Sequence, residues 1–323
     1  MLGIESTAHS FGVSLVRSSG RAVTVLSNEV AKYPSSKSGY LPRKLADFHA
    51  EKFPLVLGSA LVKADVSVFD VDAVAFSRGP GIGHCLQAGF TAAKALSLFL
   101  SVPLVPVNHA FAHAEVVRVF SKAKDPLVVY VSGGNTQIFC KQNGFFHVLG
   151  ETLDVGIGNF LDNLGRLLNL NPPDAVGVLK NAQKGRKLVS LPYVVKGMNT
   201  SYSGMLTYVE KLVGKEKAED LCFSVQEYAF AALCEASERA LLHSGKTELL
   251  LCGGNARNKR LQEMMRKVAK SQKARFCISS DKFLGDNAAM IAVAGVSIQK
   301  ANAVSKELLP FQNLRVESEK AFW

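Results

Sequence analysis

The chain has 323 residues, a formal net charge of +11 and a pI near 9.3, with 48% hydrophobic and 20% charged residues. A length above the usual single-domain range of roughly 100–200 residues favours two lobes with a large core. No apolar run approaches the ~20 residues of a membrane-spanning helix. The N-terminus lacks the basic and then apolar pattern of a secretory signal, so we expect a cytoplasmic protein.

Six cysteines are scattered along the chain without a Cys-x-x-Cys pair. Their spacing argues against a zinc ribbon or a disulfide framework and suits a reducing compartment. The basic charge leaves a polyanionic partner open, but by itself it neither identifies nucleic acid nor says anything about the fold.

An internal repeat is the most informative feature of the sequence. Residues 1–31 predict three strands, a small-polar loop at 6–9 and a Ser-Ser-Gly turn. Residues 127–151 repeat this plan, with a Ser-Gly-Gly-Asn-Thr loop after the first strand. Both units are therefore predicted to be antiparallel meanders. The predicted strands are 2–5, 12–16 and 22–30 in the first unit, and 127–131, 137–141 and 145–149 in the second.

Each meander is followed by helices and then by a strand, a glycine cluster and another helix. In the first half these are the strand 73–76, glycines at 79–83 and a helix from about Cys85. In the second they are the strand 248–251, Gly253-Gly254 and a helix predicted at 256–270. The repetition predicts two similar α/β lobes facing each other across a cleft. We expect residues 1–124 and about 287–323 in one lobe and 125–286 in the other.

The glycine clusters are candidate phosphate sites, because glycine lets backbone amides approach an anion closely. The loop 132–136 suits an α- or β-phosphate, and Gly253-Gly254 suits a ribose and base. Either cluster alone is better explained as an ordinary tight turn. Their paired placement in the two halves favours a nucleotide.

His109 and His113 are candidate metal ligands. A spacing of four on a helix puts both imidazoles on one face. The intervening Ala-Phe-Ala lacks the glutamate that a His-Glu-x-x-His protease requires. Two histidines on a helix surface remain the alternative.

Asp286 opens the last predicted helix, where it is either an N-cap or a third ligand. Two histidines and a carboxylate suit iron(II) or zinc, and the residues do not choose between them. Tyr130, at a strand end, is either a fourth ligand or simply a good strand former.

These motifs, in this order, resemble the universal threonylcarbamoyl-adenosine transferases of tRNA, which include the catalytic subunit of KEOPS complexes and bacterial TsaD. The Ser-Thr-Ala-His start resembles the archaeal and eukaryotic branch. The resemblance covers nearly the whole chain and implies an actin/Hsp70-like (ASKHA) fold of two duplicated RNase H-like α/β lobes. The matching segments are Gly-Ile-Glu-Ser-Thr-Ala-His at 3–9, Ala-Phe-Ser-Arg-Gly-Pro-Gly at 75–81, Asn-His-(x)3-His at 108–113, Tyr-Val-Ser-Gly-Gly-Asn-Thr-Gln at 130–137, Gly-Glu-Thr-Leu-Asp at 150–154, Lys-Gly-Met-Asn at 196–199, Ser-Gly at 203–204 and Gly-Asp-Asn-Ala-Ala-Met-Ile-Ala at 285–292.

The resemblance implies site residues. A divalent metal ion, with iron favoured and zinc possible, would be held by His109, His113, Tyr130 and Asp286, and the two histidines and the aspartate would be catalytic. An adenine nucleotide, either threonylcarbamoyl-AMP or ATP, would contact Tyr130, Val131, Ser132, Gly133, Gly134, Asp162 and Asn258.

The resemblance also implies the reaction and the partners. The threonylcarbamoyl group would pass from threonylcarbamoyl-AMP to N6 of the adenosine 3′ of the anticodon, in tRNAs that read codons beginning with A. The partners would be tRNA and three KEOPS-type subunits: an atypical protein kinase, a small dimerising subunit and a regulatory subunit. Residues 42–62 would dock a small partner, although packed surface helices explain their periodicity equally well.

Two residues depart from the family pattern. Ala175 stands where the family has a glycine and Leu179 where it has a glutamate, so a ribose contact is expected to be missing. Two alternative functions remain. An actin-like ATPase or kinase would use the same cleft, and the altered segment would suit a partner-binding scaffold with a weakened nucleotide site.

Overall fold

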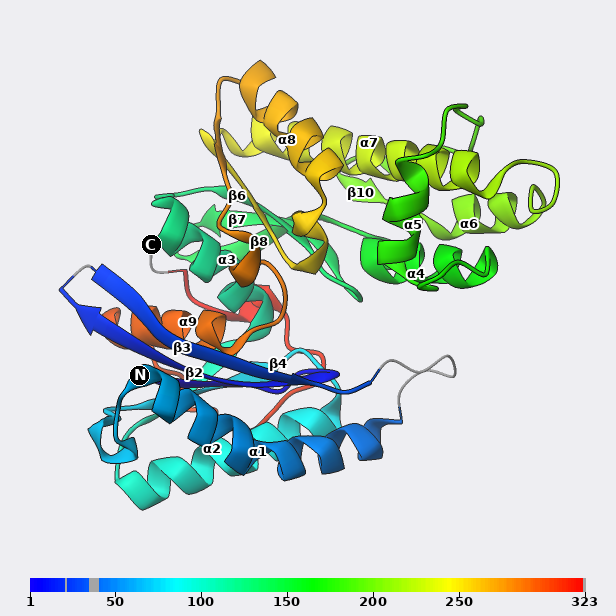
Figure 1. Cartoon of the computed structure of the whole chain (residues 1–323). Coiled ribbons are helices and arrows are strands. Elements are labelled where there is room, and N and C mark those ends of the chain that lie inside the picture. The colour runs from blue at the N-terminus through cyan, green and yellow to red at the C-terminus, as the bar shows by residue number, and fades with distance from the viewer. Residues whose placement is uncertain (21, 35–40, 322–323) are drawn as a thin grey trace. The chain divides into compact units, whose positions relative to one another are not determined.

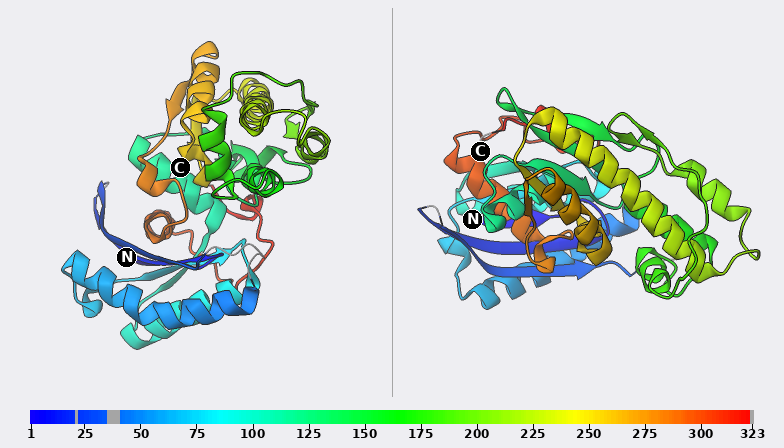
Figure 2. Two further views of the ribbon diagram at one scale, coloured as in Figure 1. Left: turned by 45° about the vertical axis from the view of Figure 1, so that its right-hand side comes forward. Right: turned by 90° about the horizontal axis from the view of Figure 1, so that it is seen from above.

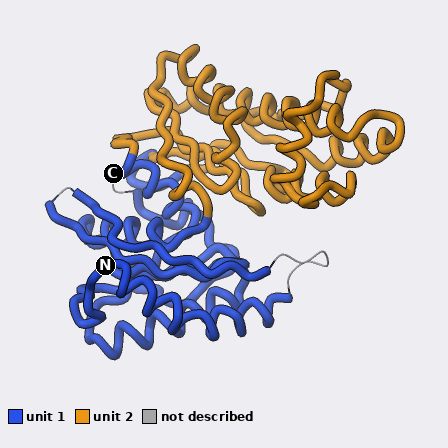
Figure 3. Tube along the Cα trace, viewed as in Figure 1, with its two compact units in different colours: residues 1–120, 142–146, 286–323 blue, residues 121–141, 147–285 orange. Residues whose placement is uncertain are grey.

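A computed structural model of the chain describes residues 1–20, 22–34 and 41–321. The chain divides into two compact units (Figure 3). Unit 1 comprises residues 1–120, 142–146 and 286–323, and unit 2 comprises residues 121–141 and 147–285. Asp286 therefore belongs to the unit that contains the N-terminal strands.

Unit 1 contains a five-stranded sheet with the order β3-β2-β1-β4-β5. The first three strands form the expected antiparallel meander, and β4 and β5 add to β1 in parallel. The strands are β1 (Leu2–Glu5), β2 (Ser10–Ser19), β3 (Ala22–Lys32), β4 (Val74–Gly79) and β5 (Leu104–Asn108).

Unit 2 repeats this arrangement in its sheet, whose order β12-β11-β6-β7-β8 is the same when read from β8. The duplication predicted from the sequence is therefore confirmed at the level of strand order. The strands are β6 (Leu127–Val131), β7 (Thr136–Gln142), β8 (Phe145–Glu151), β11 (Glu248–Cys252) and β12 (Arg275–Cys277), and a separate pair joins β9 (Val195–Lys196) to β10 (Asn199–Thr200).

Helices cover both faces of the unit 1 sheet (Figures 1 and 2). Side chains alternate along β1: Leu2 and Ile4 belong to the core cluster beneath α1, whereas Gly3 faces α9. A Cβ atom on Gly3 would lie 2.5 Å from the Ala292 nitrogen, so the glycine allows α9 to approach the sheet closely. The helices are α1 (Pro42–Ala64), α2 (Gly83–Leu100), α3 (His109–Ser121) and α9 (Ala288–Lys300), with 3-10 turns η1 (Val68–Asp70) and η4 (Val316–Ser318).

In unit 2 the long helix α7 packs against α5, α8 and the sheet (Figure 1). Among the described residues, no helix is both long and apolar enough to span a bilayer. The helices are α4 (Ile157–Leu167), α5 (Ala175–Ala182), α6 (Ser203–Glu210), α7 (Ala218–Ser244) and α8 (Lys259–Ser271), with 3-10 turns η2 (Gly254–Arg257) and η3 (Asp281–Phe283).

The predicted helix 256–270 is wrong at its start. The chain first makes a 3-10 turn, and α8 begins only at Lys259. The reason is local, because the Asn258 side chain accepts hydrogen bonds from the Arg260 and Leu261 amides and so caps the helix there.

His49 of α1 is fully buried between the rings of Phe11 and Phe48. Burial lowers its pKa to about 4, although the charge of Glu5 opposes the shift. The unfolded chain, with an ordinary histidine pKa, therefore binds more protons between about pH 6.5 and 4. Stability is expected to fall as the pH falls through that range.

The His49→Leu variant is expected to remove this source of acid sensitivity. Because of His49, the unfolding free energy of the wild type should be about 2 kcal/mol lower at pH 5 than at pH 8. The variant should lack this loss. Chemical unfolding at both pH values measures the difference. An identical loss of stability in the two proteins would show that His49 does not titrate in this way.

Candidate metal centre and glycine loop

The junction between β5 and α3 places the two histidines. The Asn108 side-chain oxygen accepts hydrogen bonds from the amides of Ala110 (3.0 Å) and Phe111 (3.2 Å), so α3 begins directly after the strand. His109 then occupies the first turn, and His113 follows one turn later. Both imidazoles are buried, with ring centroids 4.7 Å apart. They are therefore not the two surface histidines of the alternative reading.

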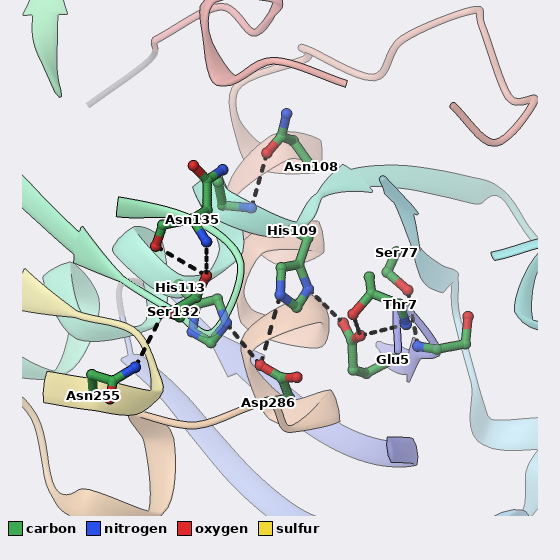
Figure 4. A network of polar contacts seen from close by, with 12 residues as sticks. Glu5, Thr7, Ser77, Asn108, His109, His113, Ser132, Asn135, Asn255 and Asp286 are labelled. Carbon is green, nitrogen blue, oxygen red and sulfur yellow. Dashed lines mark hydrogen bonds and ion pairs between the residues drawn. The ribbon is translucent and has the colours of Figure 1, made fainter. Parts of the chain in front are cut away.

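Asp286 lies directly against these two histidines (Figure 4). Its Oδ1 is 3.2 Å from Nε2 of His113 and 3.7 Å from Nε2 of His109. One ligand atom from each of the three residues lies within 4.8 Å of the others. All three residues belong to unit 1.

Of the two alternatives for Asp286, the N-cap is wrong, and the last helix does not begin at this residue. The cap of α9 is Asn287, whose side chain accepts a hydrogen bond from the Met290 amide (3.1 Å), and the helix begins at Ala288. Since Asn287 satisfies the helix end, the Asp286 carboxylate is available for the histidine cluster.

Glu5 holds His109 from the other side of its ring. Its Oε2 lies 3.1 Å from Nδ1 of His109, and its Oε1 accepts hydrogen bonds from the amide and hydroxyl of Thr7 (Figure 4). The carboxylate is 1% exposed. With Nδ1 held by Glu5, Nε2 of His109 is the nitrogen directed to Asp286, an arrangement common at metal-binding histidines.

No role for Glu5 is predicted from the sequence. The available signal was the presence of a charged residue in the short apolar strand Leu2–Glu5, which becomes fully buried. The partner that explains this burial lies 104 residues further along the chain, so no local pattern identifies it.

The electrostatics of the cluster favour a cation. Burial alone would lower the pKa of His109, but the charge and hydrogen bond of Glu5, with the charge of Asp286, raise it to about 9. Burial lowers the pKa of His113. Burial would raise the pKa of Asp286, yet the hydrogen bond from His113 and the charges of both imidazoles hold it below its usual value. Two nitrogens and one carboxylate oxygen form a donor set that suits iron(II) or zinc.

The glycine loop lies in unit 2, between β6 and β7. The Ser132 amide donates to the Asn135 carbonyl oxygen (2.9 Å), and the Asn135 amide donates to Ser132 Oγ (3.1 Å). The Asn255 side chain donates to the Ser132 carbonyl (3.1 Å, Figure 4). Gly133 and Gly134 remain exposed at the tip of this turn.

The first turn of α4 supports the loop from behind. The amides of Gly158 and Asn159 donate to the carbonyls of Ser132 (3.3 Å) and Gly133 (2.8 Å). A Cβ atom on Gly158 would lie 2.5 Å from the Asn255 side-chain nitrogen and 2.6 Å from Gly133 Cα. The loop thus packs against α4 at a distance that only a glycine at position 158 allows.

Gly158→Ala is therefore expected to displace the loop. The overpacking should cost about 1–3 kcal/mol of stability and weaken the binding of an adenine nucleotide, which calorimetric titration measures. Gly204→Ala on α6 is the matched control, because a Cβ atom there meets nothing within 4 Å. Unchanged nucleotide affinity and stability in Gly158→Ala would contradict the assignment of the loop.

The other predicted nucleotide residues all lie in unit 2. Tyr130 and Val131 are buried in β6. Asp162 of α4 accepts a hydrogen bond from the amide of Ala175 (2.8 Å), the first residue of α5. The side-chain oxygen of Asn258 already caps α8. Asp162 and Asn258 thus have structural roles that their family motifs did not indicate.

Comparison with known proteins identifies the family. A family model described as tRNA N6-adenosine threonylcarbamoyltransferase (TsaD) matches residues 24–293. The chain belongs to this family. The resemblance inferred from the motifs is confirmed. Membership of the family supports the conclusion that the chain is an enzyme that transfers threonylcarbamoyl to tRNA.

Two archaeal relatives show the extent of the similarity. The tRNA N6-adenosine threonylcarbamoyltransferase of Thermococcus sibiricus is 42% identical over 326 residues, which cover 100% of this chain and 99% of that protein. The "Probable bifunctional tRNA threonylcarbamoyladenosine biosynthesis protein" of Methanocaldococcus jannaschii is 44% identical over 300 residues. These residues cover 93% of this chain but only 55% of that longer protein.

Solved structures support the fold alone. HypF of T. kodakarensis has a TM-score of 0.67 at 15% identity, covering 96% of this chain and 49% of HypF. The (R)-2-hydroxyglutaryl-CoA dehydratase component A of Acidaminococcus fermentans has a TM-score of 0.56 at 13% identity, covering 93% of this chain and 98% of that protein. The actin/Hsp70-like (ASKHA) α/β fold is thereby confirmed.

Proposed function

We propose that the chain transfers the threonylcarbamoyl group of threonylcarbamoyl-AMP to N6 of the adenosine immediately 3′ of the anticodon, in tRNAs that read codons beginning with A. Family membership supports threonylcarbamoyl as the transferred group and tRNA as the acceptor. The observation that carries the metal-dependent form of this proposal is the convergence of His109, His113 and Asp286 in one unit, with Glu5 orienting His109.

The reaction forms a bond between N6 and the carbamoyl carbon and breaks the bond from that carbon to the phosphate oxygen, so that AMP leaves and N6 loses a proton. The backbone amides of the exposed residues Gly133 and Gly134 would bind the phosphate of the adenylate and offset the charge of the leaving AMP. Holding both reactants in place would accelerate the transfer further. The adenosine must unstack from the anticodon loop to react.

The metal ligands are proposed to be His109, His113, Asp286 and Tyr130, with iron favoured and zinc possible. A divalent ion bound by these residues would polarise an oxygen of the donor and neutralise charge on the departing phosphate. The first three ligands are adjacent in unit 1, as described above. Tyr130 lies in unit 2, and its assignment rests on the family resemblance.

We further propose that the chain acts as the catalytic subunit of a KEOPS-like assembly in the cytoplasm. The packed helices α1 and α2 and the intervening turn η1 carry large exposed apolar side chains, which in soluble proteins mark interaction surfaces. The ring centroids of Phe69 and Phe99 lie 6.1 Å apart, and both residues are more than two-thirds exposed. This α1–α2 surface would dock the small dimerising subunit, and the kinase and regulatory subunits would complete the assembly.

One experiment tests the function. The purified protein is analysed for metal and then incubated with preformed threonylcarbamoyl-AMP, carrying a radiolabelled threonylcarbamoyl group, and unmodified tRNA, with and without the partner subunits. We expect label at the adenosine 3′ of the anticodon and a loss of transfer after chelation. In a parallel incubation with ATP, hydrolysis or phosphoryl transfer by a protein that shows no threonylcarbamoyl transfer would instead indicate an ATPase or kinase. Partner binding without any transfer would indicate a scaffold.

A further inference from the structure

The positive charge of the chain is concentrated in unit 2. This unit contains 23 of the 38 Lys and Arg residues but 15 of the 27 Asp and Glu residues, so it carries +8 of the formal net charge of +11. The charge of unit 1 is only +3 on the same count. A polyanion is therefore attracted mainly to unit 2.

Within unit 2, exposed basic residues gather at the end formed by α5, α6 and the start of α7, at the right of Figure 1. Three of them follow α5, and three lie in the turn between α6 and α7. We call these six residues the α5–α7 basic surface: Lys184, Arg186, Lys187, Lys211, Lys215 and Lys217.

Hydrogen bonds to α7 fix the backbone that carries the first three residues. The carboxylate of Asp220 accepts from the amides of Arg186 (2.8 Å) and Lys187 (2.9 Å), and Ser224 Oγ accepts from the Val189 amide (2.7 Å). These bonds leave the basic side chains exposed while holding the loop in one place.

The two segments of the surface also meet each other. Lys187 Nζ lies 2.7 Å from both carboxylate oxygens of Glu216, in the turn between α6 and α7. Hydrogen bonds from the two loop amides lower the pKa of Asp220, and the charges of Lys217 and Lys187 add to this effect. The six residues therefore form one positively charged surface.

Among the residues that the structure describes, only one of the six side chains is held in an ion pair. Lys187 pairs with Glu216, whereas none of the other five residues forms an ion pair within the described parts of the chain. The exposed basic face of α8 differs in this respect. There Lys259 pairs with Asp281 and Lys267 pairs with Glu263, so ion pairs within the protein offset part of the positive charge of α8.

We propose that the α5–α7 basic surface, which contains none of the residues assigned to the metal or to the nucleotide, binds the phosphate backbone of tRNA. The inference rests on the proposed function, because it takes tRNA as the acceptor. Five of the six residues are lysines, whose flexible ammonium groups bind phosphates as point charges without reading bases. The contact would therefore be shared by all acceptor tRNAs and would be strongly salt-dependent.

The test is the triple variant Lys211→Gln/Lys215→Gln/Lys217→Gln, with Lys267→Gln/Lys270→Gln/Lys273→Gln on and just after α8 as a control of equal charge change. Binding of unmodified tRNA to the full chain is measured by fluorescence anisotropy at several salt concentrations. We expect the first variant to bind about 10–100-fold more weakly at 0.1 M salt, with the slope of log K against log salt reduced by about two to three. The control should change binding less than about threefold. Thermal unfolding confirms that both variants are folded.

Equal losses in the two variants would overturn the inference, because they would reflect net charge alone. Wild-type tRNA affinity in the first variant would also overturn it. If that variant lost transfer only in the presence of the partner subunits, the surface would bind an acidic protein instead. His109→Ala separates this inference from the function, since it should lose transfer and keep tRNA binding. Absence of transfer by the wild type, with or without the partner subunits, would refute the function without affecting the binding comparison.

Discussion

The His113→Ala variant is expected to lose its metal ion and at least about 10³-fold of its transfer rate, the scale seen when a major electrostatic contribution to catalysis is removed. His113 is fully buried, and its Nε2 lies 3.2 Å from the Asp286 carboxylate, so the substitution removes one of the two imidazoles of the cluster. Elemental analysis after gel filtration measures retention of the metal. Single-turnover transfer to unmodified tRNA measures the rate.

The control for this variant is His147→Ala, which removes an exposed histidine of β8 and should change neither quantity. Since the buried substitution also affects stability, thermal unfolding is recorded with and without a chelator. Chelation should lower the melting temperature of the wild type, because an ion bound only to the folded state stabilises it. It should have no effect on His113→Ala. Stoichiometric metal in His113→Ala would refute its assignment as a ligand.

The Glu5→Gln variant is expected to bind the metal about 10–100-fold more weakly, which is typical when the partner of a ligating histidine is changed. The glutamine keeps the size of the side chain but loses the charge that holds Nδ1 of His109. Titration against a chelator of known affinity measures the change. The KM for tRNA should stay constant while kcat at limiting metal falls, as expected of a positioning residue rather than a ligand.

Glu115→Gln is the matched control for Glu5→Gln. Glu115 is also a fully buried carboxylate, on the same helix as both histidines, but its partners are Arg118 and Ser297. It should affect stability without affecting the metal. If both variants lost metal equally, general disturbance of α3 would explain the result, and the specific role of Glu5 would be refuted.

Much of the architecture follows from local patterns. The two meanders could be predicted because alternating apolar residues and glycine-rich turns recur with the same plan, and the sheets have matching strand orders. The shared face of His109 and His113 follows from their spacing on α3. Errors occur where two neighbouring residues are equally suited to one role. Asp286 and Asn287 are both good helix caps, and only the structure shows that Asn287 is used.

Features that depend on distant partners could not be predicted. The role of Glu5 requires contact with a histidine 104 residues away. The α5–α7 basic surface exists because Asp220 and Glu216 hold a loop that is distant from them in sequence. The burial of His49 likewise depends on Phe11 from another element. In each case the sequence contains the residue but not the contact that gives it a role.

X-ray absorption spectroscopy of the metal-loaded protein tests the central claim most directly. Two imidazole nitrogens and at least one carboxylate oxygen are expected around one ion, with metal–nitrogen distances of about 2.0–2.1 Å if the ion is zinc. His113→Ala, reconstituted with excess metal, should lose the imidazole contribution in part or bind no ion. A wild-type spectrum without imidazole scattering, or unchanged imidazole scattering in His113→Ala, would contradict the proposed centre.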